Sequence, residues 1–279
     1  MSAIFTTLTS YLENKQKKNK IIFTFWEPRK KIPGYLGLCI KTWKKFLFDY
    51  EIRILDYENI KEYLGEKLFS KIISKDMSLQ LQSDAIRVAI LNKYGGIWMD
   101  ADTIIINREF LKDLKKSELV MIGDTMKGTQ HIGFISASHK SHIINKWLEK
   151  IIDKVKIFKQ IKLNKTNNLK SIGWNYLGNQ IIDVLLKNST IKQFLRLDRD
   201  EMKALPELFF ENNTLDHITK YNQFWFKKEK KKIPQILNQL KGIILLHNSW
   251  TPIKYKIMQE KEFLKKDILL SRFLKYILN

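Results

Sequence analysis

The sequence contains little cysteine, proline and glycine, and each shortage excludes a class of protein. Cys39 is the only cysteine among 279 residues, so the chain can form neither an internal disulfide nor a cysteine-rich zinc site. With 5 prolines and 11 glycines, collagen-like and linker-dominated architectures are excluded. No apolar run approaches the roughly 20 residues of a membrane-spanning helix, and the N-terminal segment lacks a signal-peptide pattern. We therefore expect a cytoplasmic protein.

Acidic residues are also scarce relative to basic ones. The chain has 50 lysines and arginines against 29 acidic residues, a formal net charge of +21. A field of this sign attracts polyanions such as nucleic acid, anionic membranes or phosphorylated substrates, although a lysine-rich solvated surface explains the charge equally well. Hydrophobic residues make up 44% of the chain, which is enough for a sizeable core and excludes a disordered protein.

The order of apolar and polar segments predicts an α/β fold. A short apolar run at 21–26, closed by Pro28, is typical of a buried strand, and a helix over 36–48 and a strand over 51–55 follow it. Further helices are predicted over 58–74, 79–94, 141–160 and 176–187, and further strands over 97–99, 103–106, 120–122, 134–136 and 242–246.

The chain shows no internal repeat and no linker. We expect one domain over 1–257, which starts with a helix at 1–20, and then a basic amphipathic helix at 258–279. The Asn-rich segment 161–170 and the lysine run 227–232 are predicted to be loops.

The residues that can carry chemistry are concentrated between 83 and 102. The segment S-D-A-I-R at 83–87 is followed by G-G-I-W-M-D-A-D at 95–102. Two carboxylates one residue apart at a strand end repel each other unless a cation lies beside them. Mg²⁺ or Mn²⁺ takes such oxygen ligands and keeps positions open for phosphate oxygens. The pattern therefore predicts a phosphorylated or nucleotide substrate.

Asp84 and Arg87 lie three residues apart on the predicted helix, so they share a face. The planar guanidinium of Arg87 suits phosphate, and Asp84 is suited to accept hydrogen bonds from sugar hydroxyls. The alternative is a local Asp–Arg pair that stabilises the helix. The joined pattern, S-D-x-x-R and then G-G-x-x-x-D-x-D, is much more specific than a lone D-x-D.

This joined pattern resembles the DXD-containing sugar transferases, a group that includes capsular polysaccharide synthesis proteins and family-32-type glycosyltransferases. The resemblance is strong over 79–107 and extends from Ile21 to Trp250. It implies a GT-A-type fold, a Rossmann-like α/β architecture with a mostly parallel central sheet and added helices. It also implies a nucleotide-sugar donor, with UDP as the carrier, bound through Mn²⁺ or Mg²⁺. The reaction that the resemblance implies is transfer of a hexosyl unit to a saccharide or lipid-linked saccharide, with retention of configuration. The expected pathway is bacterial surface polysaccharide synthesis.

The resemblance also implies roles for individual residues. Asp102 is expected to bind the metal directly, and Asp100 to contact the ribose or, through water, the metal. His247 is expected to complete the metal or diphosphate site. Asp84 and Arg87 are expected to contact the donor sugar and diphosphate. The catalytic candidates are therefore Asp84, Arg87, Asp100 and Asp102.

Two tryptophans are further donor-binding candidates. Trp250 is expected to cover the sugar or diphosphate, and Trp26 to stack near the base. Relatives often carry His-Gln where this chain has Thr24-Phe25, and this departure weakens the assignment of base contacts. Ordinary core packing is the alternative for both tryptophans, and a hydrogen-bonded strand end is the alternative for His247.

Acceptor candidates lie in segments that mix aromatic, amide and glycine residues, at 131–134 and 174–180. Trp174, Asn179 and Gln180 suit sugar ring faces and hydroxyls, and the last two open a predicted helix whose N-terminus can face a phosphate. Polar caps and packing aromatics are the alternative. No general base stands out, which a retaining reaction tolerates because the leaving diphosphate itself can accept the proton.

The basic amphipathic helix at 258–279 is typical of an interfacial membrane anchor. It predicts peripheral attachment to the inner face of the cell membrane, and the alternative is a helix that docks on the core.

Other functions fit parts of the pattern. D-A-D-T at 100–103 matches the D-x-D-x-T motif of haloacid-dehalogenase-like phosphatases, in which Asp100 would attack phosphorus and Asp102 would act as acid and base. That motif normally ends an early strand, whereas here a helix and Gly-Gly precede it. The net charge favours a non-catalytic nucleic-acid-binding protein, but no recognition motif accompanies it, so we expect no nucleic-acid partner. The intact carboxylates argue against an inactive transferase scaffold.

Overall fold

The computed structural model describes residues 19–124, 129–163, 173–187, 194–198, 216–228, 233–238, 240 and 242–279. Nearly all of the predicted helix at 1–20, and most of the predicted loops at 161–170 and 227–232, lie outside these residues. The chain forms two compact units. Unit 1 comprises 1–25, 52–99 and 113–197, and unit 2 comprises 26–51, 100–112 and 198–279. Because the segments of the two units alternate along the chain, no linker marks them in the sequence.

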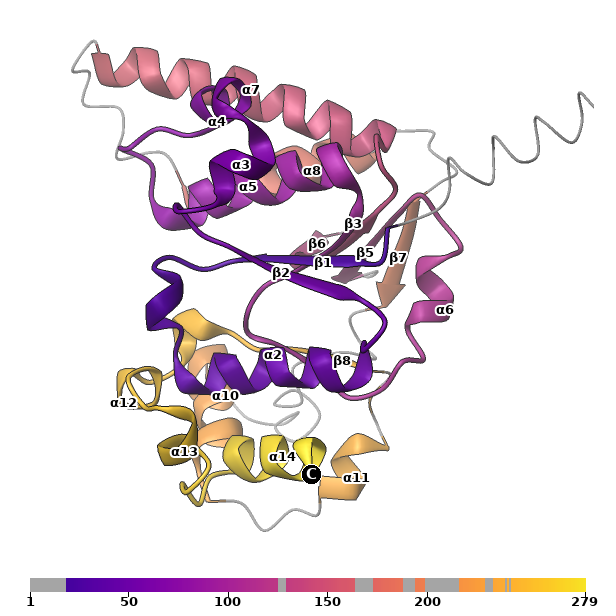
Figure 1. Cartoon of the computed structure of the whole chain (residues 1–279), viewed down its shortest axis with the longest axis vertical. Helices are drawn as coiled ribbons and strands as arrows, with labels where there is room; N and C mark the ends of the chain where they lie inside the picture. The colour runs from indigo at the N-terminus through magenta and orange to yellow at the C-terminus, as the bar shows by residue number, and fades with distance from the viewer. Residues whose placement is uncertain are drawn as a thin grey trace, which may run out of the picture. The chain divides into compact units, whose positions relative to one another are not determined.

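Unit 1 contains a six-stranded sheet of order β2-β1-β3-β6-β5-β7 (Figure 1). Its strands are β1 (Ile21–Phe25), β2 (Glu51–Leu55), β3 (Gly96–Met99), β5 (Leu119–Asp124), β6 (Thr129–Ala137) and β7 (Phe194–Asp198). β1 and β3 are parallel, with Ile22 opposite Ile97, while β6 runs antiparallel to both β3 and β5. The predicted α/β class is confirmed, and β1, α2 and β2 occur in the predicted order at the start of the described chain.

Helices cover a face of this sheet in Figure 1. They are α3 (Ile60–Leu64), α4 (Glu66–Ile72), α5 (Leu79–Tyr94), α7 (His142–Leu163) and α8 (Asn179–Lys187), and the short α6 (Leu111–Leu114) precedes β5. The predicted single helix over 58–74 is wrong, because the helix is interrupted at Gly65, which separates α3 from α4.

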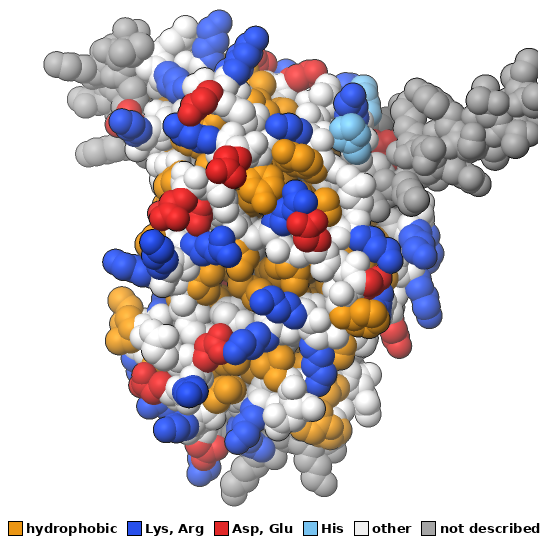
Figure 2. All heavy atoms as spheres, viewed as in Figure 1, with side chains coloured by type: hydrophobic (Ala, Val, Ile, Leu, Met, Phe, Trp, Pro, Cys, Tyr) orange, Lys and Arg blue, Asp and Glu red, His pale blue; other side chains and the backbone are white. Residues whose placement is uncertain are grey.

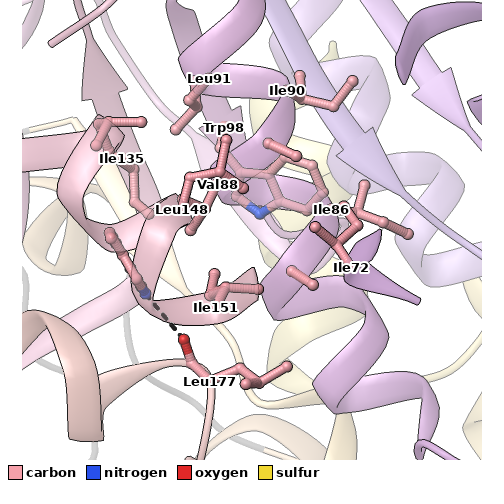
Figure 3. Close-up of a cluster of buried hydrophobic side chains, with 14 of the residues drawn as sticks. Ile72, Ile86, Val88, Ile90, Leu91, Trp98, Ile135, Leu148, Ile151 and Leu177 are labelled. Atoms are coloured by element: carbon pink, nitrogen blue, oxygen red, sulfur yellow. Dashed lines mark hydrogen bonds between the residues drawn. The ribbon is translucent and has the colours of Figure 1, made fainter. Parts of the chain in front are cut away.

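The core of unit 1 forms around α5. This helix buries residues on most of its circumference, as expected for a helix that packs on several sides. Figure 3 shows Ile86, Val88 and Leu91 of α5 among side chains of β3, β6 and α7. The indole N–H of Trp147 donates to the carbonyl of Leu177 at 2.8 Å, which ties α7 to the turn before α8.

Gly95 and Gly96 end α5 and begin β3, as the sequence predicts. Their φ angles are +65° and +95°, which other residues rarely adopt. A Cβ on Gly95 would lie 2.5 Å from the backbone nitrogen of His139, and one on Gly96 would lie 2.6 Å from the carbonyl oxygen of Ile21. The Gly-Gly pair therefore lets β3 enter the sheet beside β1.

Unit 2 consists of short helices around a two-stranded antiparallel ribbon. The ribbon pairs β4 (Thr103–Ile105) with β8 (Ile243–Leu245). The helical elements are η1 (Arg29–Lys31), α2 (Gly34–Phe46), α10 (His217–Phe226), α11 (Ile233–Leu237), η4 (Asn248–Trp250), α12 (Ile253–Lys256), α13 (Glu260–Phe263) and α14 (Leu269–Leu278). The indole of Trp43 in α2 donates to the carbonyl of Thr103 at 2.7 Å, which holds the ribbon against α2.

The C-terminal segment differs from the predicted continuous helix, since it divides into α13 and α14. The apolar side chains of α14 are buried in the core of unit 2, and they are Leu269, Leu270, Phe273, Leu274 and Ile277. The structure thus shows the alternative, a helix docked on the core. Across the described residues, the helices are too short or too polar to cross a membrane.

Candidate functional site

Asp84 and Arg87 form a buried ion pair on α5 of unit 1. Both residues are 5% exposed, and Nη2 of Arg87 lies 3.1 Å from Oδ1 of Asp84. Nη1 of Arg87 donates to the carbonyl of Ile132, and the guanidinium lies 5.3 Å from the centre of the Trp98 ring. The pair predicted from the i,i+3 spacing is present, and it is buried rather than on a solvated helix face. Burial strengthens its electrostatic interaction and fixes both groups.

The turn before α8 packs directly against this pair. A Cβ on Gly178 would lie 2.7 Å from Oδ2 of Asp84 and 2.6 Å from Cδ1 of Ile132. Only a residue without a side chain fits at this distance. Two segments singled out in the sequence, 131–134 and 174–180, therefore meet Asp84 and Arg87 within unit 1.

The three acceptor candidates occupy different environments. Nδ2 of Asn179 donates to the carbonyl of Gln130 at 2.6 Å, and Nε2 of Gln180 donates to Oδ1 of Asn175 at 3.0 Å. These amides hold the turn, as the alternative interpretation expected. Trp174 is 71% exposed, so of the three it presents the largest surface for a sugar ring. Contact with an acceptor stays a prediction for all three.

The D-A-D segment forms a turn that leads into β4 of unit 2. The N–H of Thr103 donates to the carbonyl of Asp100 at 3.0 Å, and Ala101 is buried. Asp100 and Asp102 are both partly exposed. Oδ2 of Asp102 accepts a hydrogen bond of 2.7 Å from the backbone N–H of Asn248 at the start of η4. The sequence-distant segments around 102 and 248 are thereby joined, and the Asp102 carboxylate is oriented.

His247 and Trp250 belong to an aromatic cluster beside Asn248. Their rings stack at 3.9 Å with an interplanar angle of 27°. The ring of Tyr221 packs edge-on against both, at 5.8 Å from His247 and 5.7 Å from Trp250, and its hydroxyl accepts the backbone N–H of His247 at 3.2 Å. Trp26 is partly buried and packs against the core of unit 2. The predicted neighbours His247, Trp250 and Asp102 therefore occur together in unit 2.

Sequence reasoning missed the residues that support this arrangement. Tyr221 lies on α10, which is not among the helices that the sequence predicts. The hydroxyl of Tyr35 donates to Oδ1 of Asn248, the residue whose N–H holds Asp102. The aromatic cluster H-I-T-K-Y-N-Q-F-W-F at 217–226 was the available signal, but nothing local in it points to residue 247.

Three buried groups of unit 2 hold their protons more strongly than usual. Burial raises the pKa of Tyr35 well above its ordinary value, and the charge of Asp102 raises it further. Burial and, next, the Asp102 charge raise the pKa of Cys39. Burial raises the pKa of Tyr221, against the opposing effect of its hydrogen bond with Thr251. All three groups are neutral at neutral pH.

A family model for "capsular polysaccharide synthesis protein" matches residues 2–155, a range that contains both the S-D-x-x-R segment and the D-A-D turn. The chain belongs to the capsular polysaccharide synthesis protein family. The resemblance to capsular polysaccharide synthesis proteins that was drawn from the sequence is thereby confirmed. Comparison with curated proteins gives no match.

Solved structures similar to this family member are remote in sequence. The PaToxG glycosyltransferase is 16% identical, and the alignment covers 93% of this chain and 92% of that chain with a TM-score of 0.40. The glycosyltransferase GlyE of Streptococcus pneumoniae TIGR4 is 12% identical, with a TM-score of 0.41; the alignment covers 94% of this chain and 65% of that chain. Its apo form gives a TM-score of 0.40 at the same identity.

The resemblance of this family member to DXD transferases implies a divalent cation. In the described part of the chain, no three His, Cys, Asp or Glu side chains are grouped so that they hold a metal alone. Asp100, Asp102 and His247 thus form no preassembled three-residue site. Mg²⁺, however, is usually bound by one or two carboxylates together with substrate phosphates and water. Two partly exposed carboxylates, one of them oriented by Asn248, fit that requirement.

The family member is expected to lose stability in alkaline solution because of its buried tyrosines. Unfolded Tyr35 releases its proton above about pH 10, whereas the folded side chain with its raised pKa retains it. The unfolded state then binds fewer protons, so the free energy of unfolding falls by about 1.4 kcal/mol per pH unit for such a group. Tyr35→Phe should remove that slope between about pH 10.5 and 11.5, measured by urea unfolding.

The matched control is Tyr276→Phe, because Tyr276 is a half-exposed tyrosine of the same unit. The alkaline slope of Tyr35→Phe should be shallower than that of Tyr276→Phe. Equal slopes for Tyr35→Phe and the unmodified chain would contradict the burial argument.

Proposed function

We propose that this member of the capsular polysaccharide synthesis family transfers a hexosyl unit from a UDP-sugar to a saccharide acceptor, with Mn²⁺ or Mg²⁺ and with retention of configuration. The observation that carries the proposal is the oriented carboxylate of Asp102, 2.7 Å from the Asn248 N–H, inside the range that the family model matches. The product would be an intermediate in the synthesis of a surface polysaccharide or related glycoconjugate. The acceptor is proposed to be a free or lipid-linked saccharide.

In unit 2, the proposed roles concern the diphosphate. Asp102 and Asp100 would supply oxygen ligands to the divalent cation, which when bound neutralises charge on the leaving diphosphate. His247, whose ring is held by Trp250 and Tyr221, would donate a hydrogen bond to the diphosphate or complete the metal ligands. Trp250 would cover the donor sugar. Trp26 would contact the base, although its packing on the core fits a structural role as well.

In unit 1, the proposed roles concern the donor sugar. The sheet order reverses between β1 and β3, and open α/β sheets bind ligands beyond the carboxyl ends of strands at such a point. Asp84 would accept hydrogen bonds from sugar hydroxyls. Arg87 is held by Asp84, by the carbonyl of Ile132 and by the Trp98 face. We propose that it orients Asp84 and adds positive charge for the diphosphate.

The acceptor is proposed to meet the exposed ring of Trp174, with Asn179 and Gln180 maintaining the turn. The leaving diphosphate would accept the proton of the acceptor hydroxyl, so the reaction needs no protein base.

The test is thermal unfolding with UDP, GDP, CDP and their sugars, each with Mn²⁺ or with EDTA. A ligand at about 100 times its dissociation constant stabilises a protein by about 2.7 kcal/mol, which shifts the midpoint measurably. We expect a metal-dependent shift with UDP and one UDP-sugar. A shift with another nucleotide would replace the proposed donor. No shift with any nucleotide, together with metal-dependent hydrolysis of simple phosphate esters, would favour the phosphatase reading of D-A-D-T.

A further inference from the structure

Two isoleucines project from unit 2 at α12. Ile253 and Ile257 are 78% and 75% exposed, and their i,i+4 spacing places them on one side of the turn. Tyr255, between them, is 7% exposed and stacks on Phe226 with ring centres 4.8 Å apart. The turn is thus fixed to the core by an aromatic side chain, and the isoleucines are held outward.

Basic residues flank these isoleucines along the chain. Lys254 and Lys256 belong to the same turn, and the segment 252–259 contains no acidic residue. The N–H of Gly34 donates to the carbonyl of Met258 at 3.0 Å, which joins the end of this segment to the start of α2. The exposed η1, composed of Arg29, Lys30 and Lys31, immediately precedes that point.

Figure 2 shows basic side chains spread over the visible face, with apolar side chains exposed between them. We name the set of Arg29, Lys30, Lys31, Ile253, Lys254, Lys256 and Ile257 the α12 surface.

We infer that the α12 surface docks on an anionic lipid membrane, with Ile253 and Ile257 inserted at the level of the headgroups. Apolar side chains beside a basic rim are the pattern by which proteins bind such surfaces without spanning the bilayer. The net charge of the whole chain, +21, is also complementary to the negative charge of such a membrane. This surface takes the role that the sequence assigned to the C-terminal helix, whose apolar residues are buried.

Two other occupants fit the α12 surface less well. A stable protein partner usually buries about 800 Å² on each side, whereas the apolar part here is one helical turn. A second copy of the chain in a two-fold contact would bring one basic rim against the other, and like charges repel.

The test is flotation of the full chain with phosphatidylcholine vesicles, with and without phosphatidylglycerol. We expect binding only to the vesicles that contain phosphatidylglycerol, and weaker binding at high salt. The double variant Ile253→Ser/Ile257→Ser should bind at least about tenfold more weakly. Phe48→Ser is the control, because Phe48 is a 75% exposed apolar residue elsewhere on unit 2.

A second measurement does not depend on loss of binding. Cys39 is fully buried, so Ile257→Cys can be labelled selectively with a fluorophore that responds to polarity. Its emission should shift to the blue with phosphatidylglycerol vesicles, while a label at Phe48→Cys should not respond. Absence of binding to anionic vesicles, or unchanged binding of the serine variant with no shift, would overturn the inference. A change of oligomeric state in the serine variant would instead identify a second copy as the occupant.

The inference is independent of the proposed reaction. Nucleotide binding followed by thermal unfolding needs no vesicles, and vesicle flotation needs no nucleotide, so the two can fail separately.

Discussion

Replacement of Asp102 by Asn is expected to lower kcat for sugar transfer by about 10²–10³-fold, a loss typical of removing one oriented electrostatic group. The amide oxygen can still accept the Asn248 N–H, so the turn and the fold should persist. The negative charge that would bind the cation is lost. The measurement is UDP release from the donor identified by thermal unfolding, at saturating Mn²⁺, with the midpoint of thermal unfolding as the test of folding.

Asp267→Asn is the matched control for this charge change. Asp267 is an exposed carboxylate of the same unit, paired with Lys228 at 2.7 Å. Its removal should leave kcat unchanged. Full activity of Asp102→Asn at saturating Mn²⁺ would contradict the proposed metal ligand and return attention to Asp100.

Replacement of Arg87 by Met should lower the free energy of unfolding by about 3–5 kcal/mol, since it leaves the Asp84 carboxylate buried without its partner. The side chains of both residues are only 6–7% exposed, so solvent cannot take the place of the guanidinium. Urea unfolding followed by circular dichroism measures the loss. The double variant Asp84→Asn/Arg87→Met should be less destabilised than Arg87→Met alone, because no buried charge remains.

Lys116→Met provides the comparison in the same unit. Lys116 pairs with Asp113 at the same i,i+3 spacing, but its side chain is 63% exposed. Exposed pairs contribute about 0–1 kcal/mol. Similar losses for Arg87→Met and Lys116→Met would show that the α5 pair is solvated in solution, which would contradict the buried site.

Local signals in the sequence were sufficient where the structure depends on neighbours along the chain. Helix α5 has the predicted bounds, Leu79 to Tyr94, because Gly95 and Gly96 end it. The helix predicted over 58–74 is interrupted at Gly65, and the apolar pattern alone did not reveal this interruption. In the C-terminal segment, the amphipathic pattern correctly predicted helical structure. It did not predict that the apolar face packs on the core of unit 2.

The candidate site was predictable in its charged residues and not in their supports. Asp84, Arg87 and Asp102 could be found because the spacing of carboxylates and glycines is itself a signal. Tyr35 and Asn248 could not, because their contact joins positions 213 residues apart and neither type is unusual where it stands. The division into two units was likewise hidden, since each unit is assembled from three separate stretches.

Within the G-G-x-x-x-D-x-D motif, the glycines at 95 and 96 and the aspartates are subject to different constraints. The glycines are required by the backbone carbonyl of Ile21 and the backbone of His139, and neither demand involves a sugar or a nucleotide. The carboxylates that follow are the groups that the proposed reaction would use, although Asp102 also accepts the N–H of Asn248. A homologue that has lost activity would therefore still need the glycine pair in order to fold. In such a homologue the aspartates would be substituted before the glycines. A relative with Gly-Gly but without D-x-D should fold normally and bind no cation there.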